Sequence, residues 1–212
     1  MILRLVNEIE YQIYKMTPDK KNTQRFKSIL DVAAKIFREK GYHHANISDI
    51  AKGAGLLKGS LYYYVSSKQE LLYEVVMGGL DLYIASLRKI FTSIQPPDVL
   101  LKEAIIAHMD PMDIEFDMVH VFINETTNLT DRYRKQVDNE TNRYKKLWIE
   151  ILEKGKKHGI FRADLDTKIT LFSILGMCNW TMRWYVPSGK YQMRELAKIY
   201  AKTILNGIKV KS

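Results

Sequence analysis

Residues 58–63 combine residue types that can contact nucleic acid, in the order Lys-Gly-Ser-Leu-Tyr-Tyr. The lysine can bind a phosphate or the O6 and N7 atoms of guanine, and the serine can bind a base edge or a phosphate. The tyrosines add hydrogen bonds to phosphate and apolar contact with thymine methyl groups. The glycine permits close approach, so that backbone N–H groups can meet a phosphate. These residue types predict contact with duplex DNA.

Two short helices are expected to hold these side chains outward. The sequence predicts helices over residues 46–54 and 58–65, with a tight turn at Gly55, where a side chain would cost strain. The apolar residues expected to face the interior are Ile47, Ile50, Ala51, Leu56, Leu61 and Val65. Asn46, with Asp49 three residues on, predicts the start of the first helix. The pair describes a helix-turn-helix, whose second helix enters the major groove.

The candidate DNA-contacting residues lie on these two helices and at the start of the next one. They are Asn46, Ser48, Lys58, Gly59, Ser60, Tyr62, Tyr63 and Lys68. The alternative is that the lysines are solvated surface charges and that the tyrosines pack in the core. For Tyr64 the pattern leaves core packing and an outward position equally open.

Charge and composition limit the class of protein. The 212 residues carry a net charge of +9, and charge per residue is more than twice as high in the first 70 as in the remainder, which favours a polyanionic partner. The single cysteine, Cys178, argues against a disulfide scaffold. No apolar run approaches the ~18 residues of a membrane span, and early charges interrupt any secretory segment. We therefore expect a soluble cytoplasmic protein that does not associate with membranes.

The sequence predicts an all-α protein, because apolar residues recur at three- and four-residue spacing and strand-like alternation is never sustained. Helices are expected over residues 23–40, 46–54, 58–65, 67–94, 98–109, 113–127, 130–157, 166–185 and 192–207. Breaks are expected at Gly41, Pro96-Pro97, Pro111, Asn128-Leu129-Thr130, Gly159 and Pro187-Ser188-Gly189. Residues 23–69 are predicted as a compact basic unit and residues 70–212 as a larger helical bundle.

Residues 1–22 allow two interpretations as an N-terminal extension. Leu5, Ile9, Ile13 and Met16 recur at helical spacing, which predicts an additional amphipathic helix. Alternatively, Met16 is the true initiator and the residues before it come from a mis-assigned translation start. Neither interpretation assigns chemistry to the segment.

Spaced residues in the first third resemble the TetR family of bacterial one-component regulators. The matching residues are Phe37-x3-Gly41-Tyr42, Ile50-Ala51-x2-Ala54-Gly55, Lys58-Gly59-Ser60-Leu61-Tyr62-x-Tyr64 and Ser67-Lys68-x2-Leu71-Leu72. The resemblance implies an N-terminal helix-turn-helix domain and a C-terminal domain for ligand binding and dimerisation. It further implies a homodimer that binds a palindromic operator and leaves it when a small molecule binds.

Three residues depart from the family pattern. Leu57 stands where the family usually has Ser or Thr capping the recognition helix, so about 1 kcal/mol of local stabilisation is expected to be missing. Ala45 and Val65 replace the commoner Thr and Phe. These two changes put one phosphate contact in doubt but leave the expected fold unchanged.

The resemblance places dimerisation on the last two long helices, over residues 166–185 and 192–207. The residues assigned to this interface are Leu171, Ile174, Leu175, Leu196, Ile199, Tyr200, Thr203 and Ile204. A symmetric interface matches a palindromic operator, whose half-sites lie about 34–36 Å or a multiple of that apart.

Residues 176–189 resemble the corresponding segment of TetR regulators of fatty-acid and sterol catabolism that respond to acyl-CoA thioesters. The informative residues are Asn179-Trp180, Arg183-Trp184-Tyr185 and Gly189. An aromatic helix end with an arginine can stack an adenine and pair a phosphate. Trp180, Arg183, Trp184 and Tyr185 are therefore candidate effector contacts. The alternative is that the three aromatic residues pack in the dimer core.

Phe116, His120 and Asn124 complete the candidate effector-binding set. Residues 113–127 offer apolar walls with a few polar anchors, which suits a small hydrophobic effector such as a fatty acyl-CoA, but also a hydrophobic drug. His108, Asp110, Asp113 and His120 lack the spacing of a metal-ligand set, so we expect no metal or cofactor.

A ligand-responsive transcriptional repressor is the leading interpretation. No nucleophile elbow, phosphate-cradling glycine loop or paired-carboxylate motif supports an enzyme. The alternative function is that of a TetR-like structural or protein-interaction factor that stays on DNA without a small-molecule inducer.

Overall fold

A computed structural model describes residues 24–92 and 94–210, and the predicted N-terminal extension lies outside them. The helices in chain order are α2 (Gln24–His44), α3 (Ile47–Gly53), α4 (Lys58–Leu61), α5 (Lys68–Arg88), η2 (Lys89–Thr92), α6 (Pro97–Ile114), α7 (Phe116–Glu125), η3 (Thr126–Asn128), α8 (Asp131–Lys157), α9 (Thr167–Trp180), η4 (Thr181–Arg183) and α10 (Met193–Ile208). The β pairing within the described residues is one isolated antiparallel bridge, between Phe161 and Lys209. The predicted all-α fold class is confirmed.

By contact, the described residues divide into two compact units. One unit holds residues 24–81 and 115–140, and the other holds residues 82–92, 94–114 and 141–210. Helices α5 and α8 each contribute to both units. The predicted boundary at residue 69 separates the DNA-binding residues from those expected to bind ligand and dimerise. The division by contacts instead places α7 and the first part of α8 in the same unit as the helix-turn-helix.

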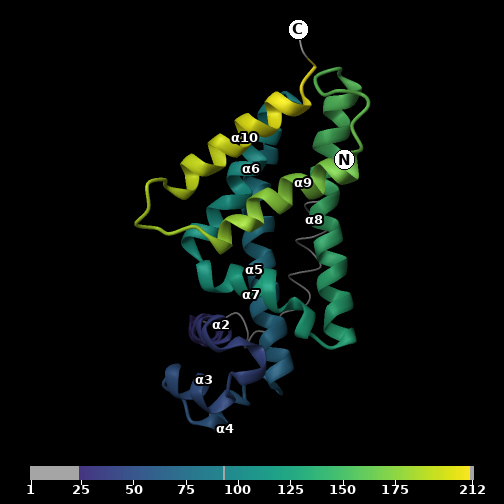
Figure 1. Ribbon diagram of the computed structural model, residues 1–212. Helices are drawn as coiled ribbons and strands as arrows, with labels where there is room; N and C mark the ends of the chain where they lie inside the picture. Colours follow the sequence, from purple (N-terminus) through teal and green to yellow (C-terminus); the bar gives the residue numbers. More distant parts are fainter. Residues whose placement is uncertain (1–23, 93, 211–212) are drawn as a thin grey trace. The chain divides into compact units, whose positions relative to one another are not determined.

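In the first unit, α2, α3 and α4 form a small helical group (Figure 1). Ile50, Leu61 and Val65 are buried and fix the two short helices against the interior. The turn between them contains Gly55 at φ +64°, the left-handed region that glycine adopts without strain. Arg25 of α2 donates a hydrogen bond to the Gly55 carbonyl at 3.2 Å, which ties α2 to this turn.

Helix α5 begins with a side-chain cap from Ser67 and packs closely against α7. The Ser67 hydroxyl accepts from the Glu70 N–H at 3.1 Å, while the Glu70 carboxylate accepts from Ser66 rather than Ser67. A Cβ on Gly79 would lie 2.8 Å from the Phe122 Cβ, so only glycine allows this approach of α7.

In the second unit, α10 lies along α6 and beside α9 (Figure 1). The buried side chains of this unit come from all of its helices, and the largest that are fully buried are Trp148, Tyr83 and Phe161. Residues after α8 are joined to the end of α10 by two backbone hydrogen bonds. The Arg162 N–H donates to the Ile208 carbonyl, and the Val210 N–H donates to the Ile160 carbonyl.

Two predicted helix ends were wrong. Helix α6 runs through Pro111, where a break was expected, and stops at Ile114. Met109, Pro111 and Met112 are all buried there, so packing outweighs the lost backbone hydrogen bond. Helix α4 ends at Leu61 instead of residue 65, and turns follow it. Among the described residues, no helix combines the length and apolarity needed to cross a bilayer.

Candidate nucleic-acid interface and effector-binding residues

Five residues of the predicted DNA-contacting set form an exposed surface at α4, which we call the recognition surface. It consists of Lys58, Gly59, Ser60, Tyr62 and Tyr63. The Tyr62 and Tyr63 side chains are 46% and 62% exposed, although tyrosines commonly bury much of their ring. A Cβ built on Gly59 would meet no other atom of residues 24–92 and 94–210 within 4 Å, beyond its chain neighbours and its own helix backbone, so this part of the chain leaves the backbone uncovered. The surface is therefore open to a partner.

Packing beneath the recognition surface explains why it points outward. Leu61 and Val65 are buried and occupy the inward positions. Tyr64 is half-buried and stacks on Phe26 of α2, with ring centroids 6.2 Å apart, so its role is packing. The Tyr63 ring meets the Tyr64 ring edge-on at 5.3 Å, which supports the exposed tyrosine from below.

The two short helices begin differently. Asn46 caps α3, since its side-chain oxygen accepts from the Ser48 N–H at 2.9 Å, and the Ser48 side chain is exposed. Lys40 of α2 pairs with Asp49 of α3 at 2.7 Å. Helix α4 has no side-chain cap, because Leu57 stands at its N-cap position and is 80% exposed. The expected loss of that cap is confirmed.

The Lys68 side chain contacts the end of α2. Its ammonium donates to the His43 carbonyl at 3.2 Å and lies 4.5 Å from the centre of the Tyr42 ring. Burial lowers the pKa of Lys68. The next residue, Gln69, donates to the Tyr42 hydroxyl at 2.7 Å. Both side chains therefore fasten the start of α5 to the end of α2.

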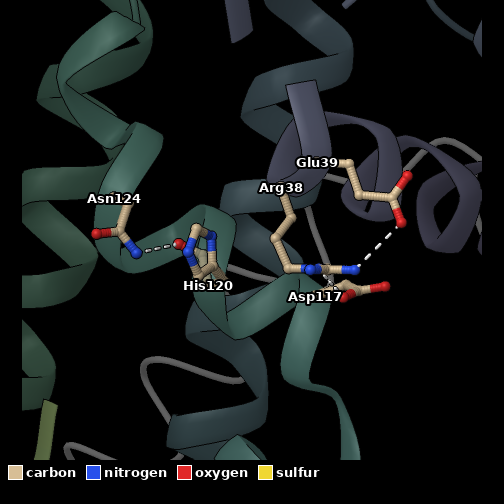
Figure 2. A network of polar contacts seen from close by, with 5 residues as sticks. All are labelled: Arg38, Glu39, Asp117, His120 and Asn124. Atoms are coloured by element: carbon tan, nitrogen blue, oxygen red, sulfur yellow. Dashed lines mark hydrogen bonds and ion pairs between the residues drawn. The ribbon is translucent and has the colours of Figure 1, made fainter. Parts of the chain in front are cut away.

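The predicted effector residues of α7 contact α2 and their own helix. Arg38 of α2 pairs with Asp117 (Figure 2). Its guanidinium carbon lies 5.8 Å from the centre of the Phe116 ring. Phe116 and His120 have ring centroids 6.1 Å apart. The Asn124 amide donates to the His120 carbonyl at 2.9 Å, as Figure 2 shows. The contacts of Phe116 and Asn124 are thus structural ones between and within helices.

The second group of predicted effector residues divides between surface and interior. Trp180 is 64% exposed at the end of α9, and the Arg183 guanidinium carbon lies 5.9 Å from the centre of its indole. No carboxylate of the described chain pairs with Arg183, and Trp184 is exposed as well. Tyr185 is buried and donates to Asp113 at 3.3 Å. Trp180 and Arg183 therefore form an exposed aromatic–cationic pair, whereas Tyr185 supports the fold.

The sequence did not reveal a buried polar cluster in the second unit. The His108 ring nitrogens face the Tyr144 hydroxyl at 2.8 Å and the Asn179 side-chain oxygen at 3.0 Å. Tyr83 stacks on the imidazole at 4.4 Å, and Trp148 meets it edge-on at 5.8 Å. Burial lowers the pKa of His108 to about 4, so the ring is neutral at physiological pH. The signal in the sequence was the position of His108 among the regularly spaced apolar residues of α6, which indicates a buried histidine that needs hydrogen-bond partners.

Several predicted dimer residues are buried in the single chain. Leu171, Ile174, Leu175, Leu196 and Ile204 are buried. They pack α9 and α10 against the rest of their own unit. Of the remaining three, the Tyr200 hydroxyl hydrogen-bonds the Thr181 hydroxyl at 3.1 Å, whereas Ile199 and Thr203 are exposed.

The four residues considered for a metal do not gather into one site. Across residues 24–92 and 94–210, no group of three or more His, Cys, Asp or Glu side chains is arranged to hold an ion. His108 takes part in the buried cluster and Asp113 accepts from Tyr185.

Two family descriptions match the chain. Residues 29–75 match bacterial regulatory proteins of the tetR family, and residues 95–208 match the tetracyclin repressor-like C-terminal domain. These ranges contain the recognition surface and the α9–α10 region respectively.

Known proteins are similar over most of the chain. The HTH-type transcriptional repressor KstR2 of Rhodococcus jostii is 32% identical over 182 residues, which span 85% of this chain and 89% of that protein. The fatty acid metabolism regulator protein of Bacillus subtilis is 22% identical over 190 residues, 89% of this chain and 98% of that one. The structure of the ketosteroid transcriptional regulator KstR2 of Mycobacterium tuberculosis superposes with a TM-score of 0.81 at 29% identity, covering 90% and 97% of the two chains. The chain therefore belongs to the TetR family of transcriptional regulators, a family of DNA-binding proteins rather than enzymes.

Proposed function

We propose that the protein is a ligand-responsive transcriptional repressor that binds a palindromic operator as a homodimer. The observation that carries the proposal is the exposure of the recognition surface above the buried Leu61 and Val65. Relatives such as KstR2 of Rhodococcus jostii are named transcriptional repressors, which supports repression as the mode of control.

The recognition surface supplies the chemistry for operator binding. Lys58 would bind a phosphate or a guanine edge, and Ser60 a base edge or a phosphate. Tyr62 and Tyr63 would donate to phosphates and contact thymine methyl groups. The open space at Gly59 leaves room for the DNA backbone. Phosphate contacts would set the affinity and base-edge contacts the sequence preference.

A second copy of the chain would dock on the exposed apolar side chains of α9 and α10, which we call the dimer face. The dimer face consists of Ile169, Phe172, Met177, Ile199 and Thr203. Phe172 and Ile199 are each 45% exposed, and large apolar side chains that stay exposed on neighbouring helices commonly mark an interface. A two-fold axis through this face would pair the two recognition surfaces with a palindromic operator.

The effector would be a small hydrophobic molecule, for which a fatty acyl-CoA is the best candidate. Trp180 offers an exposed ring on which an adenine can stack, and Arg183 has no acidic partner among the described residues and can bind a phosphate. The names of the relatives, which refer to ketosteroids and fatty acid metabolism, support a lipid-like effector.

The test is a titration of the protein bound to an operator selected from random duplex DNA. Acyl-CoAs, free fatty acids and cationic drugs are added in turn, and release is followed by fluorescence anisotropy. We expect acyl-CoAs to release the protein. Arg183→Ala should require an about tenfold higher acyl-CoA concentration, because a charge-assisted contact is lost, while operator affinity stays unchanged.

Arg162→Ala is the matched control, since Arg162 is an exposed arginine of the same unit that faces Asp164. If Arg183→Ala and Arg162→Ala respond alike, the acyl-CoA assignment is wrong. If no compound of the panel releases the wild-type protein, a DNA-bound factor without an inducer becomes the better description.

A further inference from the structure

Leu57 is a large apolar side chain that lies in the open beside the recognition surface. It is 80% exposed, and among the large apolar residues of the described chain only Ile94 is more exposed. It directly precedes Lys58, in the turn between α3 and α4. A single exposed leucine needs no explanation on most protein surfaces. Here it adjoins the side chains proposed to contact bases, so it would meet the same partner.

Helix α4 uses the backbone of Leu57 but not its side chain. The Leu57 carbonyl accepts from the N–H groups of Ser60 and Leu61, at 3.0 and 3.2 Å, which starts the helix. A hydroxyl side chain at this position could also accept a hydrogen bond from the first turn, whereas an isobutyl group cannot. The inward positions are already occupied by the buried Leu61 and Val65. Neither capping nor core packing therefore accounts for a leucine at position 57.

The major groove of DNA offers one apolar group to such a side chain. Base pairs present hydrogen-bond donors and acceptors there, and thymine alone adds a C5-methyl group. In helix-turn-helix proteins, the first residues of the second helix contact the base edges. An aliphatic side chain gains free energy by covering a methyl group and loses it by covering a polar edge that is left without a partner. The exposed isobutyl group of Leu57 therefore fits thymine better than any other base.

We propose that Leu57 is a specificity-determining residue, which packs on the C5-methyl group of a thymine in each half-site of the operator. The inference rests on the proposed function and adds a base preference to it. The exposed Lys58 and Ser60 supply the polar contacts around this methyl group. Because Leu57 stands where the family usually has Ser or Thr, the preference belongs to this chain and not to the family as a whole.

The test removes the methyl group and nothing else from the DNA. An operator is selected from random duplex DNA with the full-length protein, and each thymine of one half-site is replaced in turn by deoxyuridine. Affinities are measured by fluorescence anisotropy. In the wild type we expect one replacement to weaken binding about two- to fivefold, the size of burying one methyl group. 5-Bromodeoxyuridine at the same position should restore the affinity, because bromine returns an apolar group of similar size.

Leu57→Ala removes the isobutyl group without adding a cap, since alanine caps a helix as poorly as leucine does. At the thymine contacted by Leu57, this variant should bind the thymine and deoxyuridine operators equally well. The comparison uses the ratio of two affinities for one protein, so a change in the folding of α4 cancels. Leu57→Met keeps a large apolar side chain and should retain the preference. Tyr62→Ala and Tyr63→Ala should weaken binding overall and retain it as well.

The outcomes separate this inference from the proposed function. If every deoxyuridine replacement affects the wild type and Leu57→Ala equally, or if the selected half-site contains no thymine, the role of Leu57 is wrong although the protein still binds an operator. If the wild type selects no sequence from random DNA, the operator-binding part of the proposed function fails and the inference fails with it.

Discussion

At the scale of single residues, Lys58 has the role that is simplest to measure. It is exposed at the start of α4, so its removal should leave the fold unchanged. Each lost phosphate contact should reduce the slope of log affinity against log salt concentration by about 0.9. We expect Lys58→Ala to weaken operator binding and to flatten this slope in salt-dependent anisotropy measurements.

Lys168→Ala provides the control for loss of charge. Lys168 is exposed on α9, which does not belong to the helix-turn-helix. Its salt slope should stay close to that of the wild type. A Lys58→Ala protein with unaltered affinity and slope would remove Lys58 from the interface.

His108 makes the stability of the fold depend on pH. Burial lowers its pKa from 6.5 to about 4. Between these pH values the imidazole is protonated in the unfolded chain and neutral in the folded chain. The stabilisation is present above pH 6.5 and is lost as the pH falls towards 4, by about 3 kcal/mol in total. Urea unfolding at pH 7.5 and at pH 5 should show the decrease.

His108→Gln removes this titration, so its free energy of unfolding should change less between the two pH values. The comparison uses the difference in free energy of unfolding between the two pH values and not its absolute size, because the substitution also alters packing against Tyr83. Equal pH dependence in the two proteins would show that His108 does not titrate as described.

At the residue scale, the sequence predicted side chains on the surface better than those inside. The outward positions of Tyr62 and Tyr63 follow from the helical spacing of Leu61 and Val65, which depends on neighbours in the chain. The contacts of His108 with Tyr144 and Asn179 join residues 36 and 71 positions apart, and no local pattern encodes them.

At the scale of helices, the errors have a common physical cause. The break expected at Pro111 rests on local backbone preference, but burial along α6 outweighs it. In α9 and α10, helical spacing identified the apolar residues, five of which are buried within the single chain. The side to which an apolar stripe turns is decided by the tertiary fold.

The end of α8 provides a test of packing at the helix scale. A Cβ on Gly155 would lie 2.0 Å from the ring of the buried Phe161, so the ring or the helix must move. We expect Gly155→Ala to lower the free energy of unfolding by about 1–3 kcal/mol, despite the better helix propensity of alanine. Chemical denaturation measures the change.

Gly207→Ala serves as the matched control in α10, since no atom lies within 4 Å of its added Cβ. Its stability should equal or slightly exceed that of the wild type. If both variants lose the same stability, the close contact between Gly155 and Phe161 is not the cause.

At the scale of the whole molecule, the proposed repressor depends on association of two chains. Phe172→Glu places a charge in the dimer face, so it should yield a monomer in light scattering and weaken operator binding by more than tenfold. Ile114→Glu is the control, because Ile114 is exposed on α6 outside the dimer face. A Phe172→Glu protein that remains dimeric would place the interface elsewhere.

The uncapped start of α4 also affects how the protein meets its operator. A four-residue helix that lacks a side-chain cap at its start is expected to open and close readily in the free protein. Docking into a groove would then complete the folding of this turn, and the conformational entropy lost would oppose binding. We therefore expect the affinity to vary strongly with temperature, because recognition and local folding form a single step.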